Sequence, residues 1–148
     1  MDVAATWKGG LAFAGIAESG FSVAMDASED VGGGGAGLRP TELVALGLAG
    51  CTGMDVIAIL RKKRQDVREM TVRVHVEQAD EHPRVFIRIA IEYAVSGRGI
   101  DPAAVARAIE LSSTKYCPVE AMLRKTAEVT TQYTIHEVGD GGSEIEDR

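Results

Sequence analysis

The chain has 148 residues, a length typical of one domain, and 45% of them are hydrophobic, which is enough for a packed core. Its formal net charge of -6 argues against nucleic-acid binding, because phosphate contacts need clustered Lys and Arg side chains. The opening residues carry no signal-peptide pattern, and two cysteines are too few for a secreted disulfide scaffold. We therefore expect a cytoplasmic protein whose thiols are free, catalytic or transiently bridged.

The N-terminal part of the chain predicts a three-stranded meander over residues 3–25. Apolar side chains alternate there with small or polar ones, and Gly9-Gly10 and Ser19-Gly20 offer the two turns. A glycine-rich loop follows at residues 32–37. It matches GxGxxG almost automatically, but no βαβ unit surrounds it, so the motif does not support a nucleotide site.

A long apolar helix is predicted from Pro40 to about Arg64. Residues 43–60 are nearly all apolar, yet Asp55 near the middle and three glycines disfavour a membrane span, so we interpret the segment as a buried central helix. The helix is apolar around most of its circumference, and such a helix must be covered on all sides. The pattern therefore predicts a homodimer in which a second copy supplies the missing cover.

The rest of the chain predicts strands and helices in turn. Strands are expected near residues 72–77, 85–95 and 129–135, and helices are expected to begin at Asp101-Pro102 and Cys117-Pro118. The element order is βββ-α-ββ-α-α-β, which indicates an α+β fold with antiparallel sheets packed around the central helix. Residues 1–138 are expected to form a single domain, and residues 139–148 an acidic, disordered tail.

The two cysteines are the strongest chemical signal. Cys51 lies deep in the long helix between Gly50 and Gly53, and these small neighbours let another backbone, or a substrate, come close to the sulfur. Cys117 precedes Pro118 at a helix start, where free N–H groups and the helix dipole can lower a thiol pKa. A buried inert thiol at Cys51 and a simple N-cap at Cys117 remain as alternatives. As a pair, they suit an attacking and a resolving thiol.

Two segments around these cysteines resemble a known family. Residues 39–45 lead into Gly50-Cys51-Thr52, and residues 115–123 contain the second cysteine. Together they are similar to the OsmC/Ohr family of osmotically inducible and organic hydroperoxide resistance proteins, over roughly residues 1–138. The resemblance implies an intertwined homodimer and thiol peroxidase activity on organic hydroperoxides. It also implies that Cys51 attacks, that Cys117 resolves, and that an external thiol, commonly a dihydrolipoyl group, re-reduces the disulfide without a bound cofactor.

The resemblance departs from the family pattern at two charged positions. The peroxidase members carry an Arg in the N-terminal meander, whereas this chain has none before Arg39. They also carry a Glu directly after the Pro of the helix start, where this chain has Thr41 and then Glu42. Glu42 precedes Cys51 by nine residues, about 13 Å along a helix. We therefore expect Arg39 and Glu42 to support the Cys51 thiolate of a partner chain.

The sequence leaves undecided both the function of the protein and the role of the Asp55 carboxylate. The first function is a peroxiredoxin-like thiol peroxidase in oxidative-stress defence; the main alternative is a non-catalytic, dimeric redox-sensing or small-molecule-binding protein. A purely structural protein with inert thiols is the third and weakest option. Asp55, one helical turn after Cys51, would raise a thiol pKa, and we expect it either to cap a polar network or to pair with a partner-chain cation.

The three histidines show no metal-ligand spacing, so no metal is expected. The apolar lining expected around Cys51 is Leu46, Leu48, Met54 and Met122.

Overall fold

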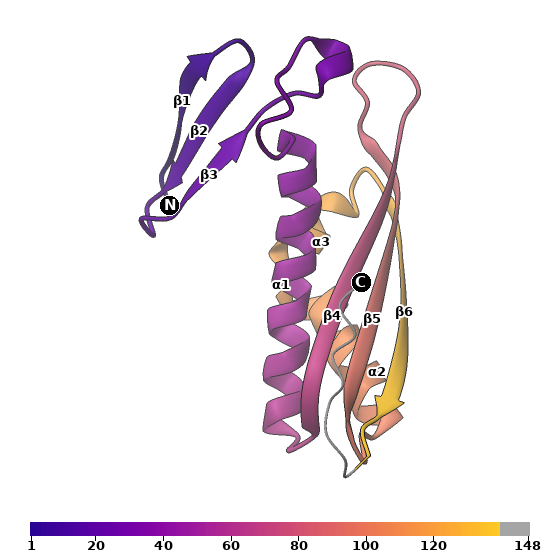
Figure 1. Ribbon diagram of the computed structural model, residues 1–148. Helices are drawn as coiled ribbons and strands as arrows, with labels where there is room; N and C mark the ends of the chain where they lie inside the picture. Colours follow the sequence, from indigo (N-terminus) through magenta and orange to yellow (C-terminus); the bar gives the residue numbers. More distant parts are fainter. Residues whose placement is uncertain (140–148) are drawn as a thin grey trace. The chain divides into compact units, whose positions relative to one another are not determined.

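The computed structural model describes residues 1–139, and its elements follow the predicted βββ-α-ββ-α-α-β order (Figure 1). The strands are β1 (Val3–Gly9), β2 (Ala12–Ala17), β3 (Ser22–Met25), β4 (Asp66–Gln78), β5 (Phe86–Arg98) and β6 (Glu128–Glu137). The α-helices are α1 (Pro40–Lys62), α2 (Pro102–Leu111) and α3 (Pro118–Leu123). Apart from Gly139, the expected acidic tail lies outside the described residues.

The chain divides into two compact units, of which the first is residues 1–46. Its antiparallel sheet has the order β1-β2-β3, as the meander pattern predicted. The glycine-rich loop after β3 is held by the carboxylate of Asp26, which accepts hydrogen bonds from the backbone N–H groups of Ala36, Ala27 and Gly34. These bonds, led by the one from Ala36, lower the pKa of Asp26.

Helix α1 is buried along one face only in the single chain. It ends at Lys62, two residues before the expected end. Its fully or nearly buried residues recur at helical spacing, and they are Leu48, Thr52, Gly53, Val56 and Leu60. The helix has 23 residues, and an 18-residue stretch of it has a mean hydropathy of 2.1, so its length and composition would be enough to cross a membrane. Only 28% of that stretch is buried in the chain. The predicted full burial of this helix therefore needs cover from outside the chain.

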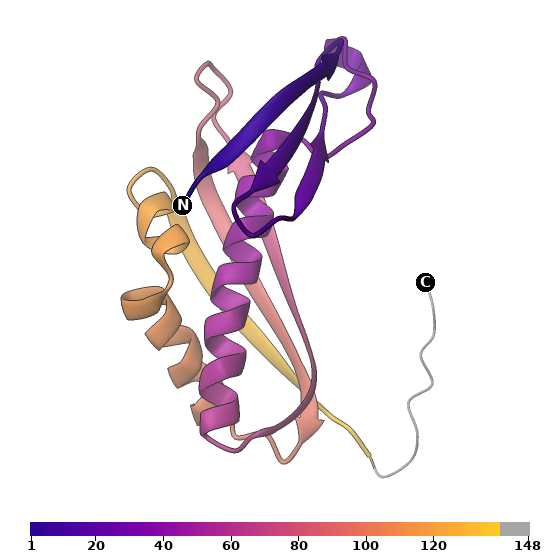
Figure 2. The same ribbon diagram turned by 90° about the vertical axis from the view of Figure 1, so that its left-hand side faces the viewer.

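The second unit, from Gly47 onward, contains a mixed sheet of order β4-β5-β6. β4 and β5 pair antiparallel, whereas β6 pairs parallel to β5, which corrects the expectation of purely antiparallel sheets. The reason is the connection: two helices separate β5 from β6, and such a crossover returns the chain in the same direction. The helices of this unit lie on one face of the sheet (Figure 2).

The helices after β5 begin where the sequence predicted. The Asp101 side chain caps α2 by accepting a hydrogen bond from the backbone N–H of Ala103 at 2.9 Å. A π-helical turn over Ser112–Tyr116, which the sequence did not predict, then leads to Cys117 at the N-cap of α3. The inner face of α2 continues into this turn, and its residues Val105, Ala108, Ile109 and Ser112 are all buried.

Candidate functional site

The structure brings the two cysteines together within the second unit. The sulfurs of Cys51 in α1 and Cys117 at the start of α3 lie within 4.8 Å of each other, and both thiols are free. An oxygen of the Asp55 carboxylate lies within the same distance of both sulfurs. A disulfide needs an S–S length of about 2.05 Å, so bridging requires the sulfurs to approach by less than about 3 Å.

The two thiols have unequal surroundings. Cys51 is partly buried, whereas Cys117 is only 3% exposed. Burial raises the pKa of the Cys117 thiol to about 11; the backbone N–H of Glu120, which donates to its sulfur at 3.4 Å, lowers the pKa, and the neighbouring Cys51 raises it. The expectation of a lowered pKa at this helix start is therefore wrong, because the loss of water around the sulfur outweighs the helix-terminal hydrogen bonds.

A series of hydrogen-bonded hydroxyl groups connects Asp55 to Tyr93. Ser112 donates to the Asp55 carboxylate at 2.9 Å, and the hydroxyls of Ser112 and Thr52 lie 2.9 Å apart. The hydroxyl of Thr52 also lies 2.5 Å from that of Tyr93 in the centre of β5. Burial raises the pKa of Tyr93 to about 12, so this phenol stays protonated at neutral pH. Asp55 thus caps a polar network, one of its two expected roles.

A second buried carboxylate lies beside Cys117. Glu120 in α3 has no exposed surface, and its Oε1 accepts hydrogen bonds from Ser113 at 2.6 Å and from Arg124 at 2.6 and 2.9 Å. Its Oε2 is buried and has no hydrogen-bond partner within the described residues. The ion pair with Arg124 offsets the cost of burying this charge and fixes the turn on which Cys117 sits.

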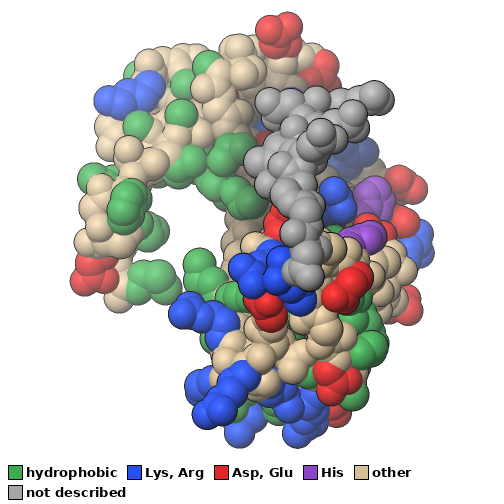
Figure 3. Space-filling view, turned by 60° about the horizontal axis from the view of Figure 1, so that its bottom comes forward, with side chains coloured by type: hydrophobic (Ala, Val, Ile, Leu, Met, Phe, Trp, Pro, Cys, Tyr) green, Lys and Arg blue, Asp and Glu red, His purple; other side chains and the backbone are tan. Residues whose placement is uncertain are grey.

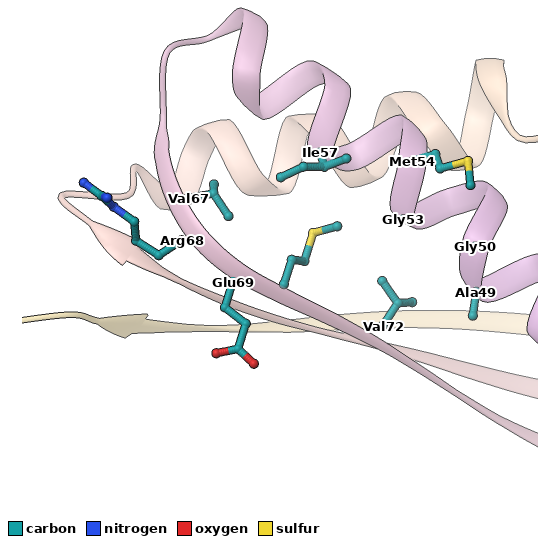
Figure 4. Close-up of a pocket in the computed structure, with 10 residues that line it drawn as sticks. Ala49, Gly50, Gly53, Met54, Ile57, Val67, Arg68, Glu69 and Val72 are labelled. Atoms are coloured by element: carbon teal, nitrogen blue, oxygen red, sulfur yellow. The ribbon is translucent and has the colours of Figure 1, made fainter. Parts of the chain in front are cut away.

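The two glycines beside Cys51 have different surroundings. A Cβ atom at Gly53 would approach the Val72 side chain to 3.2 Å, so Gly53 lets α1 pack closely on β4. At Gly50 a Cβ atom would meet nothing within 4 Å. Both glycines line an open groove of about 550 Å³ between α1 and β4, into which Ile57 and Val72 point (Figure 4). Neither thiol lines this groove, and approach of a substrate to the Cys51 sulfur past these glycines stays a prediction.

The predicted apolar lining is only partly available to a substrate. Leu48 is fully buried in the core, whereas Leu46, Met54 and Met122 are between 58% and 72% exposed. Leu48 therefore stabilises the fold and cannot contact a substrate in this chain.

Arg39 and Glu42 pair with each other at the start of α1. The Arg39 guanidinium donates to Glu42 Oε1 at 3.1 Å, and the Arg39 backbone N–H donates to Glu42 Oε2 at 2.9 Å. The backbone bond contributes most to the lowered pKa of Glu42. This arrangement caps the helix, since the side chain of the third helical residue returns to a free N–H group. Support of Cys51 by these residues stays a prediction.

Sequence reasoning missed the polar residues that surround the thiols. Thr52, Tyr93, Ser112 and Glu120 come from four different elements, and hydroxyl or carboxyl groups at such separations form no recognisable motif. One signal was present: Tyr93 is the single hydroxyl-bearing residue among the apolar, inward-facing positions of the β5 pattern. A buried hydroxyl needs a hydrogen-bond partner, which in this protein is Thr52.

Comparison with known proteins agrees with the fold. The family model described as OsmC-like protein matches residues 32–132. The chain belongs to the OsmC family. A curated relative, protein YhfA of Escherichia coli strain K12, is 38% identical over 135 residues, which cover 91% of this chain and 98% of YhfA.

Solved structures extend the comparison of this OsmC-family protein. A hypothetical protein from Aquifex aeolicus superposes with a TM-score of 0.82 at 25% identity, covering 93% of this chain and 97% of the other. An organic hydroperoxide resistance protein OsmC from Legionella pneumophila superposes with a TM-score of 0.66 at 15% identity, covering 90% and 97%. The second likeness concerns the fold alone.

Proposed function

We propose that this protein is a thiol peroxidase that reduces organic hydroperoxides, with Cys51 as the attacking and Cys117 as the resolving thiol. The observation that carries the proposal is the approach of the two sulfurs to within 4.8 Å, with Cys51 the more accessible of the two. The membership of the OsmC family and the hydroperoxide resistance protein among its structural neighbours favour the same substrate class. The proposed location is the cytoplasm, where thiols are kept reduced.

The reaction has three steps. The Cys51 thiolate attacks one oxygen of the hydroperoxide; the O–O bond breaks, the alcohol leaves with a proton, and Cys51 becomes a sulfenic acid. Cys117 then loses its proton and attacks the Cys51 sulfur as a thiolate; the S–S bond forms, and the sulfenic hydroxyl leaves with that proton as water. An external dithiol, proposed to be a dihydrolipoyl group, reduces the disulfide and is itself oxidised. Cys117 suits the role of the resolving thiol. Its raised pKa keeps it protonated at neutral pH, and a protonated thiol is a weaker nucleophile than a thiolate, so Cys51 should attack the peroxide first.

We further propose that the working molecule is a homodimer. Large apolar side chains are exposed in the single chain, among them Trp7 at 64%, Phe21 at 80% and Met54 at 72%. Hydrophobic side chains reach the surface in Figure 3 as well. An open apolar groove of about 440 Å³, lined by residues of β1, β2 and β3 with Leu43, adds to this surface within the first unit. Such patches favour association. Sedimentation of the purified protein tests this point, and a monomer at micromolar concentration contradicts it.

The alternative is a non-catalytic redox sensor or binding protein of the same fold. It is favoured by the neighbours of Cys51, which are a carboxylate and a second thiol, whereas an attacking thiolate is usually stabilised by a cation. In the enzyme, that cation would be Arg39 of a second copy.

Turnover kinetics separate the two functions. Reduced protein in a chelating buffer receives cumene hydroperoxide or hydrogen peroxide together with dihydrolipoamide, and peroxide loss is followed over many equivalents. We expect repeated turnover that is faster with cumene hydroperoxide and abolished in Cys51→Ser. Cys117→Ser should still consume one equivalent and then stop as the sulfenic acid. A single slow oxidation of the unaltered protein contradicts the enzyme and favours the sensor.

A further inference from the structure

The proposed peroxidase uses two thiols and leaves the third member of the cluster, Asp55, without a role in the chemistry. The carboxylate and the sulfurs of Cys51 and Cys117 lie within 4.8 Å of one another. Each of the three residues offers one atom that metal ions commonly bind, and these atoms come from two separate elements, α1 and the start of α3. The described structure thus brings together a donor set for a single cation.

The spacing of the three groups fits one small metal ion. Zinc lies about 2.3 Å from a cysteine sulfur and about 2.0–2.2 Å from a carboxylate oxygen. Two ligand atoms on the same zinc ion are therefore about 3.8 Å apart in tetrahedral geometry, and at most about 4.6 Å apart if they lie on opposite sides of the ion. Because the observed separations are all within 4.8 Å, a contraction of at most about 1 Å brings the three atoms to bonding distance. Rotation of the Cys51 and Asp55 side chains, both partly buried, supplies movement of this size.

The surroundings of Asp55 resemble the outer shell of a metal site. Its Oδ2 accepts a hydrogen bond from Ser112 at 2.9 Å, and Ser112 is in turn held by Thr52. Carboxylate ligands of metals are commonly oriented by such hydrogen bonds, which fix the position of the side chain. Ser112 and Thr52 have no exposed surface, so this support is rigid.

We propose that Cys51, Asp55 and Cys117 bind one thiophilic divalent cation of the zinc class, with the fourth position left to water or a small ligand. Two thiolates with one carboxylate select zinc over magnesium or calcium, which prefer oxygen ligands only. Three protein ligands with one open position are the usual set of a zinc site that exchanges its fourth ligand. No sequence motif marks this site, because its two cysteines are 66 residues apart and no histidine takes part.

Metal binding and peroxidase turnover are separate properties of the same cysteines. A bound cation holds both thiolates as ligands and so withholds them from a peroxide. The metal-bound form is therefore inactive as a peroxidase, and turnover requires the metal-free form. Because binding is measured without peroxide, and turnover in a chelating buffer, either proposal can fail while the other stands.

Cobalt titration of the reduced protein tests the site. Tetrahedral cobalt bound to thiolates absorbs in the near ultraviolet, and we expect this band to saturate at one ion per chain and to be removed by zinc. Cys51→Ser and Cys117→Ser should each lose most of the band. Asp55→Asn and Ser112→Ala should each weaken the affinity about tenfold or more, by removing a ligand and its support respectively. Asp66→Asn is the matched control, since that carboxylate pairs with Arg68 at the surface, and it should bind as the unaltered protein does.

A second measurement on the unaltered protein avoids any variant that fails to fold. Stoichiometric zinc should slow alkylation of both cysteines by at least about tenfold, and a chelator should restore the rate. Absence of a thiolate band, or alkylation unaffected by zinc, overturns the proposal. Equal affinity in Asp55→Asn and the unaltered protein overturns the three-ligand site.

Discussion

The hydroxyl of Thr52 in α1 lies 2.9 Å from the hydroxyl of Ser112, 60 residues further along the chain, and both are fully buried. This contact ties the helix that carries Cys51 to the turn that leads to Cys117. It also continues to Tyr93 on one side and to Asp55 on the other. The two sulfurs meet because this network fixes the elements that carry them.

Thr52→Val should therefore destabilise the protein by about 1–3 kcal/mol, because it keeps the shape of the side chain but leaves the buried hydroxyl of Tyr93 without its partner. Urea unfolding measures the change. Thr131→Val at an exposed position in β6 is the control and should stay within about 0.5 kcal/mol of the unaltered protein. Equal stability of the two variants would show that the network does not hold the site together.

The cysteines should react with iodoacetamide in a fixed order. Burial and a pKa raised to about 11 keep Cys117 protonated at neutral pH, so Cys51, the more exposed thiol, should be modified first. The reactivity of Cys117 should keep rising as the pH approaches about 11, because only the thiolate reacts. Peptide mapping by mass spectrometry at several pH values, in a chelating buffer, gives both rates. Faster modification of Cys117 at neutral pH contradicts the assignment.

Removal of Arg124 should be costly because it leaves the Glu120 carboxylate buried without a cation. Breaking a fully buried ion pair costs about 3–5 kcal/mol, and since Arg124 is 41% exposed we expect about 1–3 kcal/mol for Arg124→Gln. Arg107→Gln breaks the exposed pair with Glu110 and should cost less than about 1 kcal/mol. Thermal and urea unfolding compare the two. If both variants lose the same stability, the Glu120 pair does not act as a buried one.

Gly53→Ala should be less stable than Gly50→Ala. An alanine removes the helix penalty of glycine, about 1 kcal/mol, at both positions, but only at position 53 does the new methyl group crowd Val72, at 3.2 Å. Urea unfolding of the two variants gives the difference directly. A gain at position 53 as large as that at position 50 would mean that α1 and β4 are not packed as closely as the structure shows.

The sequence by itself determined the element order, the starts of the helices and the two cysteine segments. These features rest on local physics: Pro40, Pro102 and Pro118 fit only the first position of a helix, and alternation marks each strand. The α+β class follows from the element order, whereas the likeness to the OsmC family rests on the resemblance of the two cysteine segments.

The tertiary structure alone decided the direction of β6, the pairing of Arg39 with Glu42 and the surroundings of the thiols. The raised pKa of Cys117 reversed a local prediction, because desolvation depends on what packs around a sulfur, whereas the helix start beside it is visible in the sequence. Asp55, Ser112, Thr52 and Tyr93 form one network although up to 60 residues separate its bonded members. Such contacts depend on side chains meeting across a finished core, and no local pattern records them.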